Sequence, residues 1–149
     1  MNPRAASNDA IVQEITINAE AERIFDALTD PEELLEWWCI EDQFHLIRAL
    51  CDVRPGGKWT MRVAGESEEE QGESIVHGVY RTVLRPNLLE YTWIREEQDH
   101  PETIVRWELQ DDGGSTRVRV THSGLNSPRL RDRNSGWIFI VQMLKDFVE

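Results

Sequence analysis

The sequence is poor in cysteine and has no long apolar segment. Its two cysteines, Cys39 and Cys51, stand twelve positions apart and form no CxxC pair, so neither a disulfide framework nor a zinc-binding signature is expected. We therefore predict free thiols in a reducing compartment. No apolar run approaches the roughly 18 residues of a transmembrane helix, and residues 1–10 lack the apolar core of a signal peptide. These absences predict a cytoplasmic protein.

Several motifs that carry enzyme chemistry are also missing. The sequence contains no nucleophile elbow, P-loop or dinucleotide-binding fingerprint. Its four histidines, His45, His77, His100 and His122, fall on separate predicted elements and form no HxH or HxxxH pair. We therefore predict no metal site. No motif indicates a cofactor either.

Basic residues are scarce relative to acidic ones. The chain has 16 Lys and Arg against 28 Asp and Glu, which gives a net charge of −12. Such a surface repels phosphate backbones and anionic lipid, so nucleic acid and membranes are not expected as partners. The acidic residues form two clusters, which are Glu66, Glu68, Glu69, Glu70 and Glu73, then Glu96, Glu97, Asp99 and Glu102. They are typical of solvated loops, and a docking patch for a basic protein partner is the alternative.

Tryptophan, in contrast, is abundant, with six residues in a chain of 149. The length suits one domain, and we assign residues 1–10 to a flexible tail and residues 11–149 to a single folded domain. Each large indole buries much surface, so the indoles can offset a modest aliphatic content. The positions of these side chains therefore matter most for the core.

The N-terminal third predicts one strand and two short helices. Alternating apolar residues place a strand at residues 11–17. An apolar stripe at helical spacing follows, with Asn18 as its cap. Asp30 and Pro31 end this helix and begin a second one, because an aspartate cap before proline is a typical helix start.

The remainder reads as a run of strands closed by a helix. Period-two alternation predicts strands at residues 45–53, 58–64, 74–84, 88–95, 103–110 and 115–123. The segment from about Pro128 is predicted as one long helix, with Trp137, Val141 and Leu144 on one face. These elements predict the α+β class, with a curved antiparallel sheet of six to seven strands around a long C-terminal helix.

One strand has two possible facings. In residues 74–84, one face carries His77, Val79 and Arg81, and the other carries Val76, Gly78, Tyr80 and Thr82. Both sets fit an inward orientation, so the sequence leaves this strand open.

The turns give the predicted sheet a polarity. Tight turns at residues 55–57, 85–87 and 111–114 fall at one end of a meander, and the acidic loops and residues 124–133 fall at the other. A ligand would enter at the end with the long loops. Arg129, Arg131 and Arg133 lie there and are candidates to pair with the acidic loops.

An ordered set of motifs resembles a known superfamily. The motifs are Ile24–Pro31, Trp37–Trp38, Arg54–Trp59, Gly78–Val79–Tyr80, Pro86, Leu89, Tyr91–Thr92–Trp93, Thr116, Thr121–Gly124 and Gly136–Trp137. Together they are similar to the START-like superfamily (SRPBCC), which includes the Bet v 1 allergens, and within it to the group named after the activator of Hsp90 ATPase. The resemblance implies a helix-grip fold over residues 11–148. It also implies binding of lipids, hormones or polyketides, or cyclase and dehydratase chemistry on polyketides.

The residues predicted to face inward are the candidate ligand-binding set. They are Trp38, Trp59, Met61, Tyr91, Trp93, Val105, Trp107, Val120, His122, Trp137, Ile140 and Val141. These side chains line a cavity or fill a packed core, and the sequence is consistent with both. His122 and Tyr91 supply the polar groups, and they are the proton-transfer candidates if the protein is an enzyme.

Three functions follow from these features. The first is a non-catalytic module that binds a small apolar or amphipathic molecule between sheet and helix. The second is a polyketide cyclase/dehydratase-like enzyme, and the third is a protein-interaction module, similar to a co-chaperone, that uses the acidic loops. Monomer and homodimer both remain open, and one exposed indole at Trp37–Trp38 would indicate a dimer contact.

Overall fold

The computed structural model describes residues 9–66, 71–96 and 100–149. Most of the predicted tail, residues 1–8, therefore lies outside the described residues. The strands are β1 (Ala10–Ile17), β2 (Cys39–Ile40), β3 (Phe44–Cys51), β4 (Lys58–Glu66), β5 (Gln71–Leu84), β6 (Leu88–Arg95), β7 (Thr103–Asp112) and β8 (Ser115–Ser123). The helices are α1 (Ala21–Thr29), α2 (Pro31–Trp37), α3 (Pro128–Arg133) and α4 (Trp137–Val148).

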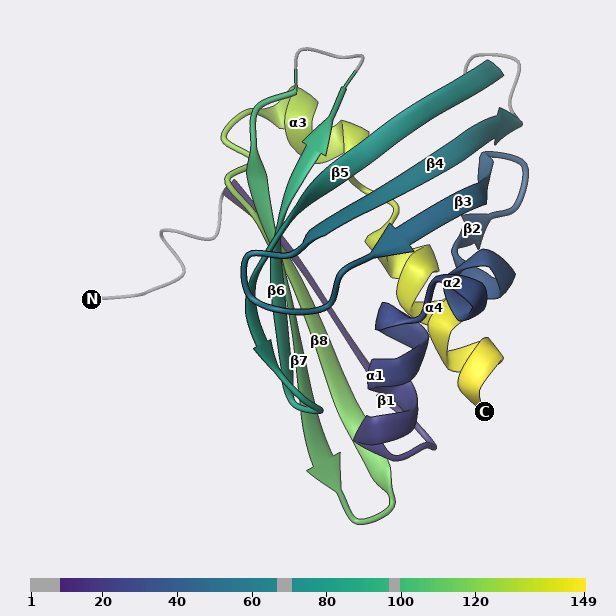
Figure 1. Ribbon diagram of the computed structural model, residues 1–149, viewed down its shortest axis with the longest axis vertical. Helices are drawn as coiled ribbons and strands as arrows, with labels where there is room; N and C mark the ends of the chain where they lie inside the picture. Colours follow the sequence, from purple (N-terminus) through teal and green to yellow (C-terminus); the bar gives the residue numbers. More distant parts are fainter. Residues whose placement is uncertain (1–8, 67–70, 97–99) are drawn as a thin grey trace.

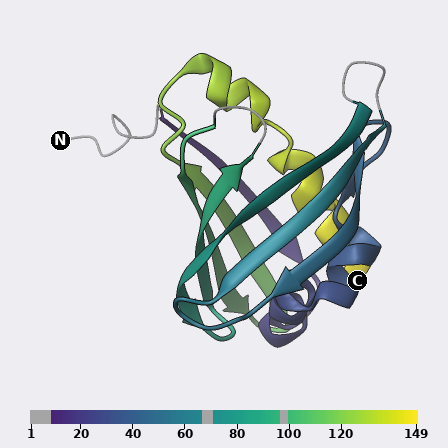
Figure 2. The ribbon, with the colours of Figure 1, turned by 45° about the horizontal axis from the view of Figure 1, so that its top comes forward.

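The strands form one antiparallel sheet that curls around α4 (Figure 1, Figure 2). Their order is β1-β8-β7-β6-β5-β4-β3-β2, so β1 joins one edge while the meander runs to the other. The α+β helix-grip fold predicted from the sequence is confirmed. The sheet has eight strands rather than six to seven, because β2 contains only two residues and is too short to show a period in the sequence.

The alternation in β6, β7 and β8 places every second side chain in the core, as the pattern predicted. In β7, for example, Val105, Trp107 and Leu109 are all buried. A sheet covered on one face by a helix requires this one-sided burial. The open question about residues 74–84 is also answered, since Val76 and Tyr80 are buried while Val79 is exposed.

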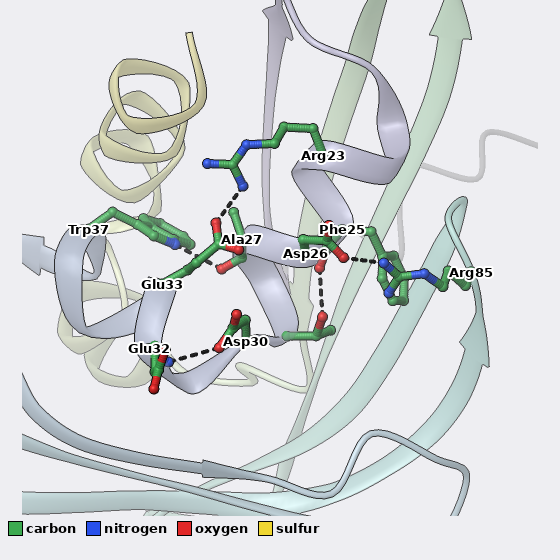
Figure 3. A network of polar contacts seen from close by, with 10 residues as sticks. Arg23, Phe25, Asp26, Ala27, Asp30, Glu32, Glu33, Trp37 and Arg85 are labelled. Carbon is green, nitrogen blue, oxygen red and sulfur yellow. Dashed lines mark hydrogen bonds and ion pairs between the residues drawn. The ribbon is translucent and has the colours of Figure 1, made fainter.

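The junction of α1 and α2 is held by several side chains (Figure 3). Trp37 donates its indole N–H to the carbonyl oxygen of Ala27 at 2.8 Å. Arg85 lies over the ring of Phe25, with its Cζ atom 4.9 Å from the ring centroid, and it pairs with Asp26. The Trp37 hydrogen bond fixes α2 against α1, while Arg85 ties α1 to the turn between β5 and β6.

Asp30 caps α2 as predicted. Its Oδ1 atom accepts a hydrogen bond from the backbone N–H of Glu32 at 3.0 Å, and Pro31 occupies the first turn. The predicted cap at Asn18 is wrong, because α1 begins after Glu20, which makes no side-chain capping bond. The backbone N–H of Asn18 instead donates to the carboxylate of Glu149.

We expect Asp30→Ala to lower the free energy of unfolding by about 1 kcal/mol, since the cap acceptor is lost. Asp30→Asn keeps a side-chain oxygen at the same place and should lose much less. Urea denaturation of the two variants measures the difference. Equal losses in both would show that the capping bond does not stabilise α2.

The predicted single C-terminal helix is in fact two helices. Asn134 ends α3, and its backbone N–H donates to the carbonyls of Leu130 and Arg131. Gly136 then begins α4. The break was missed because Asn134 and Ser135 are compatible with a continuous helix as well as with a helix end. In the structure, Asn134 is buried and its side-chain amide donates to the carbonyl oxygen of Leu130.

All six tryptophans are buried, including both members of the pair Trp37–Trp38. The exposed indole that would have indicated a dimer contact is therefore not found at this pair. The chain turns sharply after α2, which directs both rings inward. Among the helices in the described ranges, none has the length and apolar character needed to cross a bilayer.

Candidate functional site

A groove of about 90 Å³ opens between β6, the β2–β3 edge and the junction of α3 and α4. Its lining residues come from five elements and two linkers, and they are Trp38, Ile40, Phe44, Trp93, Arg95, Arg133, Asn134, Gly136, Trp137 and Ile140. The groove lies at the end of the sheet near α3, where the sequence predicted the mouth. Figure 2 shows α3 at this end of the sheet. The volume suits a small ring or a short acyl group rather than a whole lipid.

Three indoles make up the aromatic wall of the groove. The ring centroid of Trp93 lies 5.5 Å from that of Trp137 and 6.4 Å from that of Trp38. Trp38 and Trp137 are 5.9 Å apart and meet edge to face. Aromatic pairs at these separations are attractive beyond their buried area, so the wall is a fixed apolar surface.

The indole N–H of Trp93 has no hydrogen-bond acceptor. Its side chain is 93% buried and its nitrogen is closed off from solvent, yet no described residue accepts from it. Four other indoles donate normally: Trp37 to Ala27, Trp59 to Thr92, Trp107 to Tyr91 and Trp137 to His122. An orphaned buried N–H is rare in folded proteins and calls for an explanation.

The charged residues of the groove are two arginines. Arg95 and Arg133 line its outer part, and the Nη1 atom of Arg95 donates to the carbonyl oxygen of Arg133 at 3.4 Å. Nearby His100 accepts from the side-chain amide of Asn134 at 3.0 Å. Burial, together with the positive charges of the two arginines, lowers the pKa of His100.

His122 lies beneath the groove, in a chain of directed hydrogen bonds. Its Nδ1 atom accepts from the indole N–H of Trp137 at 3.0 Å. The Nε2 atom must then carry the proton, and it lies 2.7 Å from the hydroxyl of Thr103. That hydroxyl in turn donates to the carbonyl oxygen of Trp93. Burial lowers the pKa of His122 to about 3, so its ring is neutral at physiological pH.

Tyr91 is also buried in the core. Its hydroxyl accepts from the indole N–H of Trp107 at 3.0 Å, and burial raises its pKa. Neither Tyr91 nor His122 is among the residues that line the groove. Neither of the two proton-transfer candidates of the enzyme hypothesis therefore contacts the groove.

The structure divides the twelve predicted ligand-binding residues into two groups, although all twelve are buried. Trp38, Trp93, Trp137 and Ile140 line the groove. The others pack in the core beyond it, and they are Trp59, Met61, Tyr91, Val105, Trp107, Val120, His122 and Val141. Ile40, Phe44, Asn134 and Gly136 line the groove but were missed, because they lie outside the predicted strands and no alternation assigns them a facing. Arg95 was missed although it stands two residues after Trp93 in the alternating strand, and Arg133 was named only as a partner for the acidic loops.

A second hollow, of about 100 Å³, lies on the outer face of the sheet among Glu14, Glu108, Gln110, Arg117, Val118 and Arg119. Glu14 pairs with both Arg117 and Arg119 there, and the hydrogen bond from Arg119 lowers its pKa. This hollow is a solvated, charge-paired surface. It offers little apolar contact to a ligand.

The acidic clusters are only partly described. Glu66 pairs with His45, and Glu73 with Arg62, while Glu68, Glu69, Glu70, Glu97 and Asp99 lie outside the described residues. Pairing of these loops with Arg129, Arg131 and Arg133 therefore stays a prediction. Within the described ranges, no three His, Cys, Asp or Glu side chains gather in a way that would hold a metal ion.

Comparison with known proteins shows the family and the fold of the chain. Residues 18–149 match the family described as Activator of Hsp90 ATPase homolog 1-like protein. The chain belongs to this family. Among curated proteins, none matches the sequence. The resemblance read from the motifs is thereby confirmed, and the SRPBCC and Bet v 1-like superfamily is consistent with it.

Solved structures show the same fold. Protein CV1439 from Chromobacterium violaceum is 21% identical, with a TM-score of 0.82, over 95% of this chain and 98% of that one. A protein of the same family from Aeromonas hydrophila is 20% identical, with a TM-score of 0.72, over 93% and 92% of the two chains. CalU16 from Micromonospora echinospora is 21% identical, with a TM-score of 0.69, over 94% and 76%. At these identities the likeness concerns the fold alone.

Proposed function

We propose that this family member is a non-catalytic binding module for a small apolar or amphipathic molecule, which it holds in the groove at the loop-rich end. The observation that carries the proposal is the groove itself, walled by Trp38, Trp93 and Trp137. Concave, mostly apolar sites with a few polar groups are typical of small-molecule binding. The neutral, bonded state of His122 favours binding over proton transfer as the role of the site.

A ligand bound in the groove is expected to stabilise the protein by an amount that rises with the logarithm of the free ligand concentration above its dissociation constant. A ligand present at 100 times its dissociation constant adds about 2.7 kcal/mol to the free energy of unfolding. A thermal-shift series with small substituted benzenes measures this. Tryptophan fluorescence reports the same binding, since three of the six indoles line the groove.

Gly136→Ala is expected to weaken this binding roughly fivefold, because a methyl group removes a substantial part of so small a volume. The added Cβ atom would lie 2.7 Å from the Cδ1 atom of Ile40, a flexible side-chain end that also lines the groove. The fold should tolerate the change, since Gly136 has a φ of −78°. Titration followed by tryptophan fluorescence gives the affinities.

Ile138→Ala is the matched control, because Ile138 is exposed on the first turn of α4 and does not line the groove. It should bind like the wild type. If no compound stabilises the wild-type protein, or if Gly136→Ala and Ile138→Ala bind equally well, the groove is not the binding site.

A further inference from the structure

Trp93 carries a polar group that the folded protein leaves unused. The residue lines the groove, and its buried indole N–H has no acceptor among the described residues. Leaving a buried donor unpaired destabilises a protein, whereas a partner that supplies the missing acceptor recovers that free energy. Four of the other five indoles do have acceptors, so a donor left unpaired in the interior is an exception in this fold.

We infer that the groove selects ligands bearing an sp² oxygen, as in an aryl ketone or an aryl or acyl carboxylate, and that this oxygen accepts the N–H of Trp93. The inference rests on the proposed binding function and specifies its ligand class. A pure hydrocarbon would fill the same volume but leave the indole donor unpaired. Selectivity therefore comes from one hydrogen bond within an otherwise apolar site.

The surroundings of the groove favour such an oxygen. The charged side chains that line it, Arg95 and Arg133, are both cationic, and their charges lower the pKa of neighbouring His100. An oxygen with partial or full negative charge that enters the groove therefore meets cationic rather than anionic lining side chains. Trp38 and Trp137 meanwhile provide the apolar faces against which a ring or a short chain packs.

The nitrogen of Trp93 is closed off in the unliganded protein, so the ligand has to enter as the groove wall yields. Phe44 lines the groove and is only partly buried, and an incompletely packed side chain changes rotamer at low cost. A small probe tests this better than a long one, because the groove measures about 90 Å³.

Three probes of similar size isolate the hydrogen bond. Acetophenone carries a neutral sp² oxygen, benzoate carries an anionic one, and ethylbenzene carries none. We expect at least one of the two oxygen-bearing probes to bind about tenfold tighter than ethylbenzene, which corresponds to about 1.4 kcal/mol. If benzoate binds more tightly and its affinity falls with added salt, the preferred ligand oxygen is anionic. If acetophenone binds more tightly, the preferred oxygen is neutral.

Trp93→Phe keeps an aromatic ring but removes the N–H. It should bind ethylbenzene at least as well as the wild type and lose the preference for the oxygen-bearing probes. Trp38→Phe is the matched control, because it also shrinks an indole of the groove wall yet keeps the donor of Trp93. In Trp38→Phe the preference should persist.

Nitrogen–proton NMR spectra of the wild type give a direct readout. The signal missing in Trp93→Phe identifies the Trp93 N–H among the six indole signals. It should move downfield with the preferred oxygen-bearing probe and not with ethylbenzene. If all three probes bind equally and this signal moves alike with each, the inference is wrong while the binding function stands. If none of the three binds, the proposed function itself fails.

Discussion

Between pH 7 and pH 4 the folded protein is expected to lose about 3 kcal/mol of stability through His122 alone. Burial lowers its pKa from 6.5 in the unfolded chain to about 3 in the fold. The unfolded chain therefore takes up a proton first as the pH falls. The contribution of His122 is complete above pH 6.5, declines as the pH falls toward 3, and changes no further below that.

The physical reason is the direction of the hydrogen bonds around His122. The Nδ1 atom accepts from Trp137, and a protonated ring would turn this acceptor into a second donor facing an N–H group. The buried charge would also lack a partner, because the side chains bonded to the ring, Thr103 and Trp137, are neutral.

Urea unfolding at pH 7, 6, 5 and 4 measures the loss, and His122→Asn separates it from other titrating groups. The variant should be less stable than the wild type at pH 7 but lose about 3 kcal/mol less on acidification, because asparagine does not titrate. NMR titration of the wild type offers a test that needs no variant. A His122 ring that becomes protonated between pH 7 and pH 5 in the folded state would contradict the expectation.

The fold could be predicted because its sequence signals are local and repeated. Period-two alternation in β6, β7 and β8 specified both the strands and their buried face, and Asp30–Pro31 specified the start of α2. The misses share one cause. The two residues of β2 and the break at Asn134 are too short to change a periodic pattern, and tertiary contacts decide both.

The site could be predicted only in outline. The polarity of the turns indicated the end of the sheet where the groove lies, and the predicted inward-facing set includes Trp38, Trp93 and Trp137, which line it. Alternation, however, reports only that a side chain faces inward. It does not distinguish Trp107, whose N–H bonds to Tyr91, from Trp93, whose N–H has no acceptor in the described ranges. That difference depends on atoms brought together from distant strands.

The same limit applies to Gly78, whose role no motif revealed. Gly78 pairs with Trp59 across β4 and β5. A Cβ atom on it would lie 1.9 Å from the carbonyl oxygen of Thr92 and 2.8 Å from the indole nitrogen of Trp59. These two atoms already bond to each other at 3.1 Å. At Gly78, the indole of Trp59 and the backbone of β6 therefore both pack directly against the backbone of β5.

We expect Gly78→Ala to cost more than about 4 kcal/mol, enough to unfold many proteins of this size. The clash is with backbone, which cannot move aside as a side chain can, so β5 and β6 must separate and the Trp59 hydrogen bond must break. Circular dichroism and urea denaturation measure the loss.

Gly72→Ala in the same strand is the control, because it isolates backbone strain from lack of space. Gly72 has a φ of +90° and a Cβ atom there would meet nothing within 4 Å, so only the cost of a left-handed conformation applies, about 1–2 kcal/mol. Equal losses in the two variants would show that the close approach at Gly78 does not hold the sheet together. A much larger loss at Gly78 would show that the close packing of β5 and β6 around Trp59 contributes strongly to the stability of the fold. This packing lies directly behind the wall of the groove, since the ring centroid of Trp59 is 5.6 Å from that of Trp93.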